Sequence, residues 1–123
     1  MSERIAFRYE GRAVSKANFR WSPRNAASRK QWKRIKAFES EIGWLAKAAG
    51  ARCSDRPAAL YVIAINQRPD LDNLSKATID ALRGVAFHDD SQKYLIGVHI
   101  AAAKKLTEPP GLEVTIRYSE EES

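Results

Sequence analysis

The sequence is poor in the residues that build disulfides and zinc sites. Its 123 residues contain one cysteine and two histidines, so Cys53 cannot form an intramolecular disulfide and a structural zinc site is not expected. No apolar stretch approaches the roughly 20 residues that cross a bilayer, and residues 1–12 lack the apolar core of a signal peptide. These absences argue against secreted and membrane-spanning classes and predict a cytoplasmic protein.

The length and composition predict one globular domain. The chain is 44% hydrophobic and 29% charged, as in ordinary soluble proteins. A chain of this length can bury a hydrophobic core of its own. No internal repeat or low-complexity tract interrupts it, so residues 1–123 are expected to form a single domain.

Positive charge is concentrated in the first half of the chain. Residues 1–56 carry 14 Lys/Arg and 5 Asp/Glu, whereas residues 57–123 carry 7 Lys/Arg and 10 Asp/Glu. Acidic residues are absent from residues 12–36, where Phe19 and Trp21 are interleaved with the basic side chains. These cations are expected to contact a DNA backbone, although they could also serve solubility alone. The candidate DNA-binding residues are Lys16, Arg20, Arg24, Arg29, Lys30, Lys33 and Arg34.

Apolar periodicity predicts an α+β fold. Strands are expected at residues 5–9, 59–65, 94–101 and 112–119. Helices are expected at residues 28–49, where Ser28 and Gln31 form a capping-box pattern, and at residues 74–82. The run 59–65 lacks alternation, which predicts a strand buried on both faces near the centre of the sheet. The expected architecture has two layers, a mixed sheet of about four strands and two main helices, in the order β-α-β-α-β-β.

Two acids lie where a predicted strand gives way to a predicted helix, in the segment PDLDNLSK at residues 69–76. In extended backbone, Asp70 and Asp72 point to the same face. Their mutual repulsion makes it costly to ionise both, and a divalent cation would relieve it. Asp89 and Asp90, just past the helix, could supply a further ligand if the chain folds back.

Each of these residues also has a structural interpretation. Asp72 could be the N-cap of the helix, and Asp89 and Asp90 could be turn residues that bond their own backbone. Lys76 follows Asp72 by four residues, so the two could form a surface ion pair. Alternatively, Lys76 could stabilise negative charge on a reacting phosphate.

Residues 68–92 resemble the signature of the RusA family of Holliday junction resolvases. The likeness rests on an Asp-x-Asp-Asn corner at 70–73, Lys76, the Asp-Ala-Leu helix at 80–82 and an Asp-Asp-x-Gln turn at 89–92, all in order. Outside this segment the similarity is loose, and the proline that the family usually has near Ser15 is absent.

The resemblance implies a homodimeric, magnesium-dependent endonuclease that cuts four-way DNA junctions in recombination and repair. It assigns metal binding to Asp70, Asp72 and Asp90, and it makes Lys76 the essential lysine. Carboxylate ligands suit hard cations such as Mg²⁺ or Mn²⁺, and a two-fold dimer suits paired symmetric nicks.

Two other functions compete with this one. The chain could be a non-catalytic DNA-binding module, although carboxylates that face phosphates would weaken its binding. It could also be a nuclease for other branched DNA, such as flaps.

Overall fold

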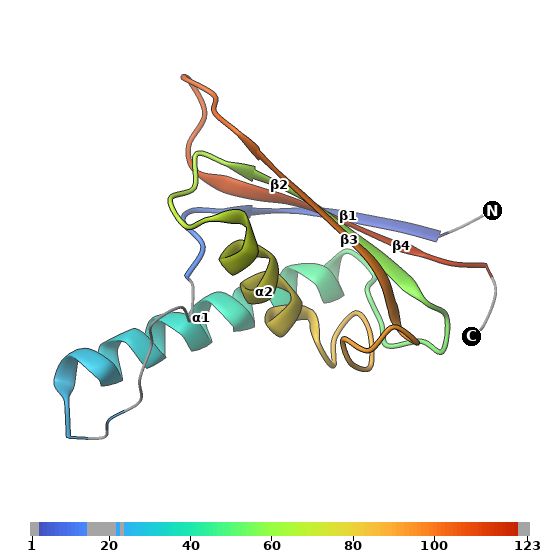
Figure 1. The fold of residues 1–123 in the computed structure, drawn as a ribbon, viewed down its shortest axis with the longest axis horizontal. Coiled ribbons are helices and arrows are strands. Elements are labelled where there is room, and N and C mark those ends of the chain that lie inside the picture. The colour runs from blue at the N-terminus through green and yellow to red at the C-terminus, as the bar shows by residue number, and fades with distance from the viewer. Residues whose placement is uncertain (1–2, 15–21, 23, 121–123) are drawn as a thin grey trace.

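The elements of the structure, a computed structural model that describes residues 3–14, 22 and 24–120, follow the expected order (Figure 1). Its strands are β1 (Glu3–Glu10), β2 (Ala58–Ile65), β3 (Leu95–Ala103) and β4 (Gly111–Tyr118). Its helices are α1 (Ala26–Ala48) and α2 (Leu71–Leu82). The predicted α+β class and the order β-α-β-α-β-β are confirmed.

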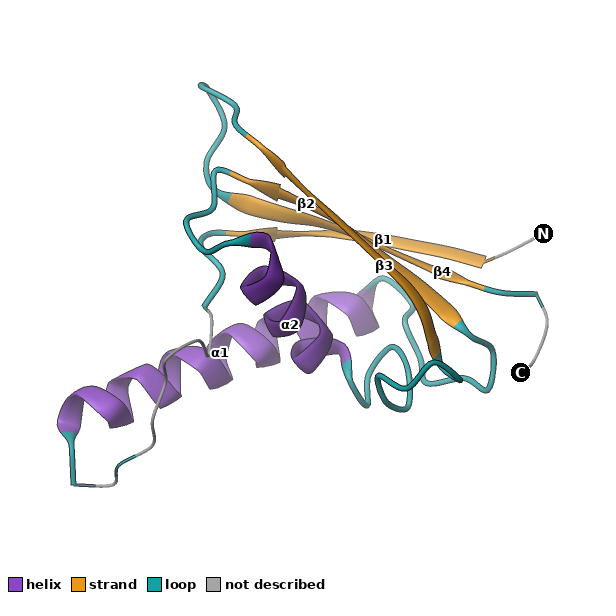
Figure 2. Ribbon diagram, viewed as in Figure 1, coloured by secondary structure: helices purple, strands orange, loops and turns teal. Residues whose placement is uncertain are grey.

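The strands form one mixed sheet in the order β1-β4-β2-β3 (Figure 2). β4 is antiparallel to both β1 and β2, whereas β3 is parallel to β2. Parallel neighbours require a crossover connection, and α2 lies in the connection from β2 to β3. Consequently α2 begins beside the C-terminal end of β2 and ends beside the start of β3.

Both helices cover the same face of the sheet, so the molecule has two layers (Figure 1). The buried side chains between the layers include Ile5, Leu60, Val62, Val114 and Ile116 from strands, and Phe38, Ile42 and Leu74 from helices. Each large apolar side chain buried in this way contributes roughly 1.5–3 kcal/mol. The N-terminal part of α1 extends beyond the sheet (Figure 1). Among the described residues, no helix has the length and apolar character needed to span a bilayer.

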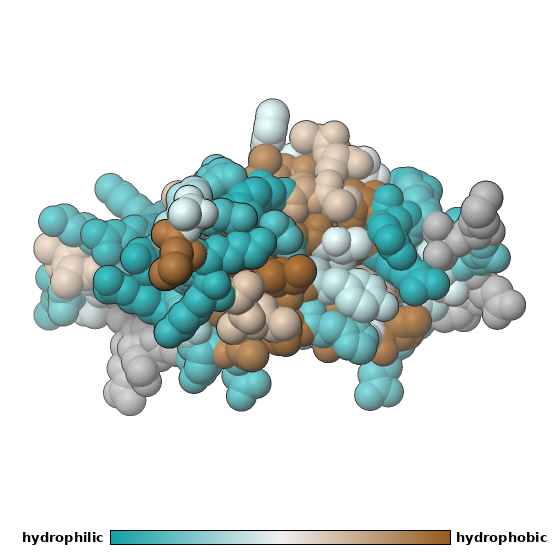
Figure 3. Space-filling view, turned by 90° about the horizontal axis from the view of Figure 1, so that it is seen from above, coloured by the Kyte–Doolittle hydropathy of each residue, from teal (hydrophilic) through white to brown (hydrophobic). Residues whose placement is uncertain are grey.

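The other face of the sheet is open, which corrects the prediction for residues 59–65. β2 lies inside the sheet, as expected, and its helix-facing side chains are buried, but on the other face only Ile65, at the end of the strand, is fully buried. Tyr61 is half-buried and Ile63 is 42% exposed. The prediction was wrong because an interior strand has both of its edges covered by neighbours, whereas burial of both faces requires a second layer. Figure 3 shows hydrophobic residues gathered across the middle of this face, between hydrophilic ends.

Helix α1 begins before the predicted cap. Asn25 is the N-cap, and its side chain accepts hydrogen bonds from the backbone N–H groups of Ala27 and Ser28. Ser28 is buried inside the first turn, where its hydroxyl accepts from the N–H of Ser22 at 2.8 Å. The capping-box prediction was wrong because Asn25 offers an equally good cap three residues earlier. Phe19 and Trp21 lie outside the described residues.

Tyr118 joins three segments of the chain through one buried hydroxyl. Its oxygen lies 2.7 Å from the carbonyl oxygen of Ala86 and 3.0 Å from that of Arg52, and it accepts from the Arg52 N–H at 3.4 Å. Burial raises the pKa of this phenol. The end of β4 is thereby fixed to the connection after α1 and to the loop after α2.

We therefore expect Tyr118→Phe to lower the free energy of unfolding by about 1–2 kcal/mol, because it leaves buried carbonyl groups without a donor. Tyr61→Phe is the matched control, because no described residue hydrogen-bonds that hydroxyl, and it should change stability by less than about 0.5 kcal/mol. Urea denaturation of both variants measures the difference. Equal losses would contradict the role assigned to the Tyr118 hydroxyl.

Candidate active site

The candidate site begins at the residue that ends β2. Asn66 has a φ of 53°, in the left-handed region that asparagine tolerates. Its side-chain oxygen accepts from the N–H of Lys105 at 3.0 Å. Its side-chain nitrogen donates to the carbonyl oxygens of Lys105 and Glu108, each at 2.9 Å. Asn66 therefore stops the strand and fixes the loop between β3 and β4 beside it.

Gln67 holds the same turn, from β2 into α2, to the end of β1 and the start of β4. Its side-chain oxygen accepts from the N–H of Ala13 at 2.9 Å, and its nitrogen donates to the carbonyl oxygens of Gly11 at 2.9 Å and Gly111 at 3.1 Å. The end of β1 and the start of β4 thus meet directly ahead of the acidic segment. Neither amide was predicted from the sequence, where the only signal is that two amide residues stand between a strand and a helix.

Asp70 and Asp72 occupy different structural positions. Asp70 has extended backbone and is the N-cap of α2, and its Oδ1 accepts from the N–H of Asn73 at 3.0 Å. Asp72 is exposed in the first turn of the helix. The helix starts at Leu71 rather than Leu74, so the expectation that the two acids share a strand face was wrong. Helix capping therefore accounts for Asp70 but not for Asp72.

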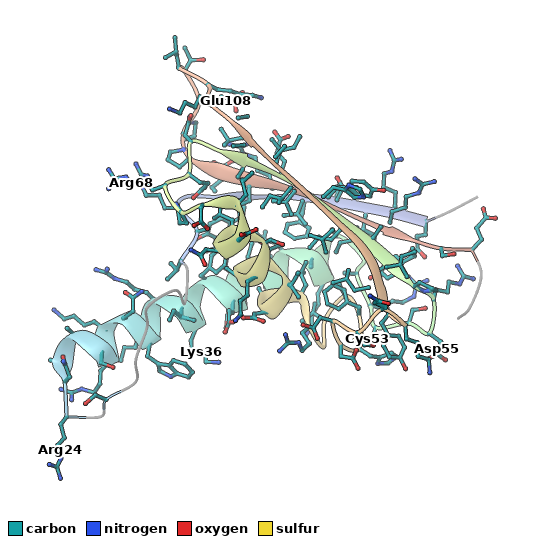
Figure 4. All side chains as sticks on the ribbon, in the orientation of Figure 1. Arg24, Lys36, Cys53, Asp55, Arg68 and Glu108 are labelled. Atoms are coloured by element: carbon teal, nitrogen blue, oxygen red, sulfur yellow. The ribbon has the colours of Figure 1, made fainter. Side chains whose placement is uncertain are left out.

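The start of α2 favours negative charge. The N–H groups of the first turn give it a partial positive charge, which offsets the repulsion between Asp70 and Asp72. Among the described residues no ion pair joins Asp72 to Lys76, although both are exposed and one turn apart. Figure 4 shows Arg68 projecting into solvent beside this helix end. This turn from β2 into α2, here called the acidic corner, thus presents the carboxylates of Asp70 and Asp72. It also presents two exposed cations, Arg68 and Lys76.

Asp90 lies at the opposite end of α2. Arg83, the C-cap residue, places its Nη2 atom 2.9 Å from Asp80 and 3.2 Å from Asp90. Neighbouring Asp89 accepts a hydrogen bond from the Ser91 N–H at 2.8 Å, as expected of a turn residue. Hydrogen bonds from the side chain and backbone of Ser91 lower the pKa of the Asp89 carboxyl.

A single chain therefore does not bring the three predicted metal ligands together. The 12 residues of α2 span about 18 Å, with Asp70 and Asp72 at one end and Asp90 beyond the other. Within the described residues, no group of three or more His, Cys, Asp or Glu side chains is placed to hold a metal ion. The corner by itself offers two acids.

Asp70 and Asp72 are suitable ligands for a hard cation such as Mg²⁺. Both are exposed, and the Asp70 carboxylate gives only one of its oxygens to the helix cap in the hydrogen bonds described. A carboxylate pair beside open solvent matches the ligation of Mg²⁺, which binds through one or two carboxylates and keeps several waters. The donor chemistry fits, whereas the number of protein ligands within one chain is small.

The predicted DNA-binding residues gather on the N-terminal part of α1. Arg24 lies just before the helix, and Arg29, Lys30, Lys33 and Arg34 are exposed on its first turns. The first turn contains no acidic residue. This part of α1 extends away from the sheet, with Arg24 at its far end (Figure 4). Lys16 and Arg20 lie outside the described residues. The described cations thus form a basic projection at one end of the molecule.

One comparison identifies a family for this arrangement. The family model described as "Endodeoxyribonuclease RusA" matches residues 10–117, which is nearly the whole chain. The match includes both the acidic corner and the basic part of α1. No curated protein matches the sequence.

Because Asp70 caps α2 and Asp72 does not, substitutions of the two acids should have different effects on stability. Asp70→Ala should lower the free energy of unfolding by about 1 kcal/mol, because it removes the helix cap, whereas Asp70→Asn keeps a capping oxygen and should cost much less. Asp72→Asn should change stability by less than about 0.5 kcal/mol. Urea denaturation of the three variants checks this order. A destabilised Asp72→Asn would mean that Asp72 has a structural role.

Proposed function

Because the chain belongs to the RusA family of endodeoxyribonucleases, we propose that it resolves four-way DNA junctions by paired phosphodiester hydrolysis, in recombination and repair. The single domain acts as a homodimer in the cytoplasm and requires Mg²⁺, for which Mn²⁺ can substitute. The observation that supports this most directly is Asp72. Its carboxylate is exposed, does not cap the helix and pairs with no described cation, so beside DNA it would repel the phosphates unless it holds a metal.

The side chains of the corner have distinct tasks in this proposal. Asp70 and Asp72 hold the cation, with Asp90 as the third acid. When bound, the cation supplies activation of water and neutralisation of phosphodiester charge. Lys76, one turn along α2 and exposed, stabilises the charge that develops on the reacting phosphate. Asn66 and Gln67 hold the corner in place through their side-chain hydrogen bonds to neighbouring segments.

The basic projection of α1 holds the DNA backbone next to this corner. Phosphate contacts of this kind supply affinity without sequence selectivity. Two subunits related by a two-fold axis present two corners and two projections. A junction, whose opposing strands are themselves related by two-fold symmetry, is cut twice by such a dimer.

We expect Asp72→Asn to abolish nicking of a labelled four-way junction in Mg²⁺ while junction binding survives or tightens, because a negative charge leaves the DNA-facing surface. Asp55→Asn is the matched control, since Asp55 lies far from Arg68 at the other end of the molecule (Figure 4) and should leave nicking unchanged. Removal of the metal with a chelator should abolish cleavage by the parent protein in the same gel assay. Equal cleavage by parent and Asp72→Asn would end the assignment.

The same assay separates the competing functions. A protein that retards the junction but never cuts it, in Mg²⁺ or Mn²⁺, would be a binding module. Faster cleavage of a flap than of a junction would change the substrate but keep the chemistry. Plain duplex DNA is the baseline for both branched substrates.

The triple variant Lys30→Ala, Lys33→Ala, Arg34→Ala should weaken junction binding and flatten its dependence on salt. Each phosphate contact contributes a slope of about −0.9 in a plot of log affinity against log salt, so the slope should fall in magnitude by up to about 2.7. Lys47→Ala, on the last turn of the same helix, should leave the slope unchanged. An unchanged slope in the triple variant would remove α1 from the DNA interface.

A further inference from the structure

The loop between β3 and β4 presents a leucine at its tip. Leu106 has a relative exposure of 106%, so its whole side chain lies in water, whereas Trp44, the next most exposed large hydrophobic residue described, is at 69%. Leu106 and Thr107 form the tip of a turn that is closed by a hydrogen bond from the N–H of Glu108 to the carbonyl oxygen of Lys105, at 3.4 Å. Turns usually carry Gly, Pro, Asn, Asp or Ser at such positions. Turn geometry therefore does not account for an apolar side chain at this tip.

The turn is held firmly at its base. The side chain of Asn66 accepts from the N–H of Lys105 at 3.0 Å and donates to the carbonyl oxygens of Lys105 and Glu108, each at 2.9 Å. Both residues that flank the tip are thus bonded to the same amide. Further along the loop, the carbonyl oxygen of Pro110 accepts from the N–H of Gly11 at 2.8 Å. The loop therefore keeps its tip in solvent instead of folding back onto the sheet.

The surroundings of Leu106 suit a polyanion. Lys104 and Lys105 directly precede it, and both are exposed. The acid of this loop, Glu108, is half-buried, and its carboxylate lies 3.4 Å from the Nζ atom of Lys105 and 3.9 Å from the Nη1 atom of Arg8. Its charge is thus compensated by two cations. Such a tip fits DNA, because the lysines attract phosphates while the leucine can contact the bases.

The tip lies beside the acidic corner. Asn66, which is bonded to Lys105, begins the turn that leads to Asp70 four residues later. Four residues span at most about 14 Å, and a DNA strand rises about 3.4 Å per nucleotide. The loop projects past the sheet at the end of the molecule where α2 begins (Figure 1). A base that contacts Leu106 is therefore only a few nucleotides away from a phosphate at the corner.

We propose that Leu106 is a wedge that enters the branch point of a bound junction and separates the bases there, while the acidic corner acts on the strand beside it. This role depends on the part of the proposed function that makes four-way DNA the substrate. Proteins that deform DNA insert apolar side chains, leucine among them, between neighbouring bases. The firmly held turn suits this task, because a loop that is already ordered loses little conformational freedom when its tip inserts.

A wedge of this kind distinguishes branched DNA from plain duplex. Within a duplex each base pair is stacked on its neighbours, so insertion must first separate two stacked pairs. At a branch point the stacking is already interrupted, and a base is extruded at least cost where it is already unpaired or poorly stacked. Leu106 is thus a specificity-determining residue, whereas Asp70 and Asp72 are the candidate catalytic residues.

Fluorescence tests the wedge without reference to cleavage. A four-way junction carries 2-aminopurine next to the branch point, a base analogue whose emission rises when it leaves the stack, and the protein is added to saturation in the presence of a chelator. The parent should raise the emission, and Leu106→Ala should lose most of that rise, because a methyl group is too short to hold two bases apart. Leu106→Met keeps an apolar side chain of similar volume and should retain the rise. Thr107→Ala is the matched control on the same turn and should also retain it.

Cleavage, binding and stability measure the consequence. Leu106→Ala should nick the junction in Mg²⁺ about tenfold more slowly than the parent, because the apolar contact that holds the branch open is lost. The salt dependence of junction binding should not change, since the substitution removes no charge. The free energy of unfolding in urea should not change either, because the side chain is fully exposed.

The outcomes separate the wedge from the proposed function. Loss of the emission rise in Leu106→Ala, with the rise kept in Leu106→Met and Thr107→Ala, supports the wedge. An equal rise in the parent and Leu106→Ala, or no rise in the parent, overturns the wedge, and nicking by the parent then leaves the proposed function standing. A rise that depends on Leu106 in a protein that never nicks the junction supports the wedge and overturns the proposed function. An equal loss in Thr107→Ala would assign the effect to the turn as a whole and overturn the role of the leucine.

Discussion

The hydrogen bonds of Asn66 and Gln67 determine where the chain turns from β2 into α2. Asn66 ties this turn to the loop after β3, and Gln67 ties it to the end of β1 and the start of β4. Three strand ends are thus fixed to one short segment, and the cap at Asp70 follows within four residues. The positions of both corner acids depend on these bonds, because the bonds fix the backbone that leads into α2.

The sequence predicted the parts of the fold that periodicity controls. Alternating residues such as Ile5, Phe7 and Tyr9 located β1, and the same pattern located β4. Periodicity could not show that β2 would have one open face, since this depends on how many layers the chain can build. It also could not choose between Asn25 and Ser28 as the cap of α1, because the two residue types cap equally well and tertiary packing decides.

The acidic corner shows a similar limit in the site. Spacing alone placed Asp70 and Asp72 together, and the structure keeps them within one turn of each other. It divides their tasks, since Asp70 caps the helix and Asp72 does not. The roles of the Asn66 and Gln67 amides could not be predicted from the sequence, because their partners are backbone groups of distant segments. No local sequence pattern indicates such partners. Likewise, the local sequence gives no measure of the span between Asp72 and Asp90, which is set by the length of α2.

The length of α2 limits which acids one chain can bring to a single cation. A helix of about 18 Å between the corner and Asp90 cannot be shortened by side-chain motion, because its ends are fixed by the Asp70 cap and by Arg83. A cation held at the corner would therefore have Asp70 and Asp72 as its carboxylate ligands among the described residues of this chain. Mg²⁺ tolerates so few protein ligands, because it keeps several waters in its coordination shell.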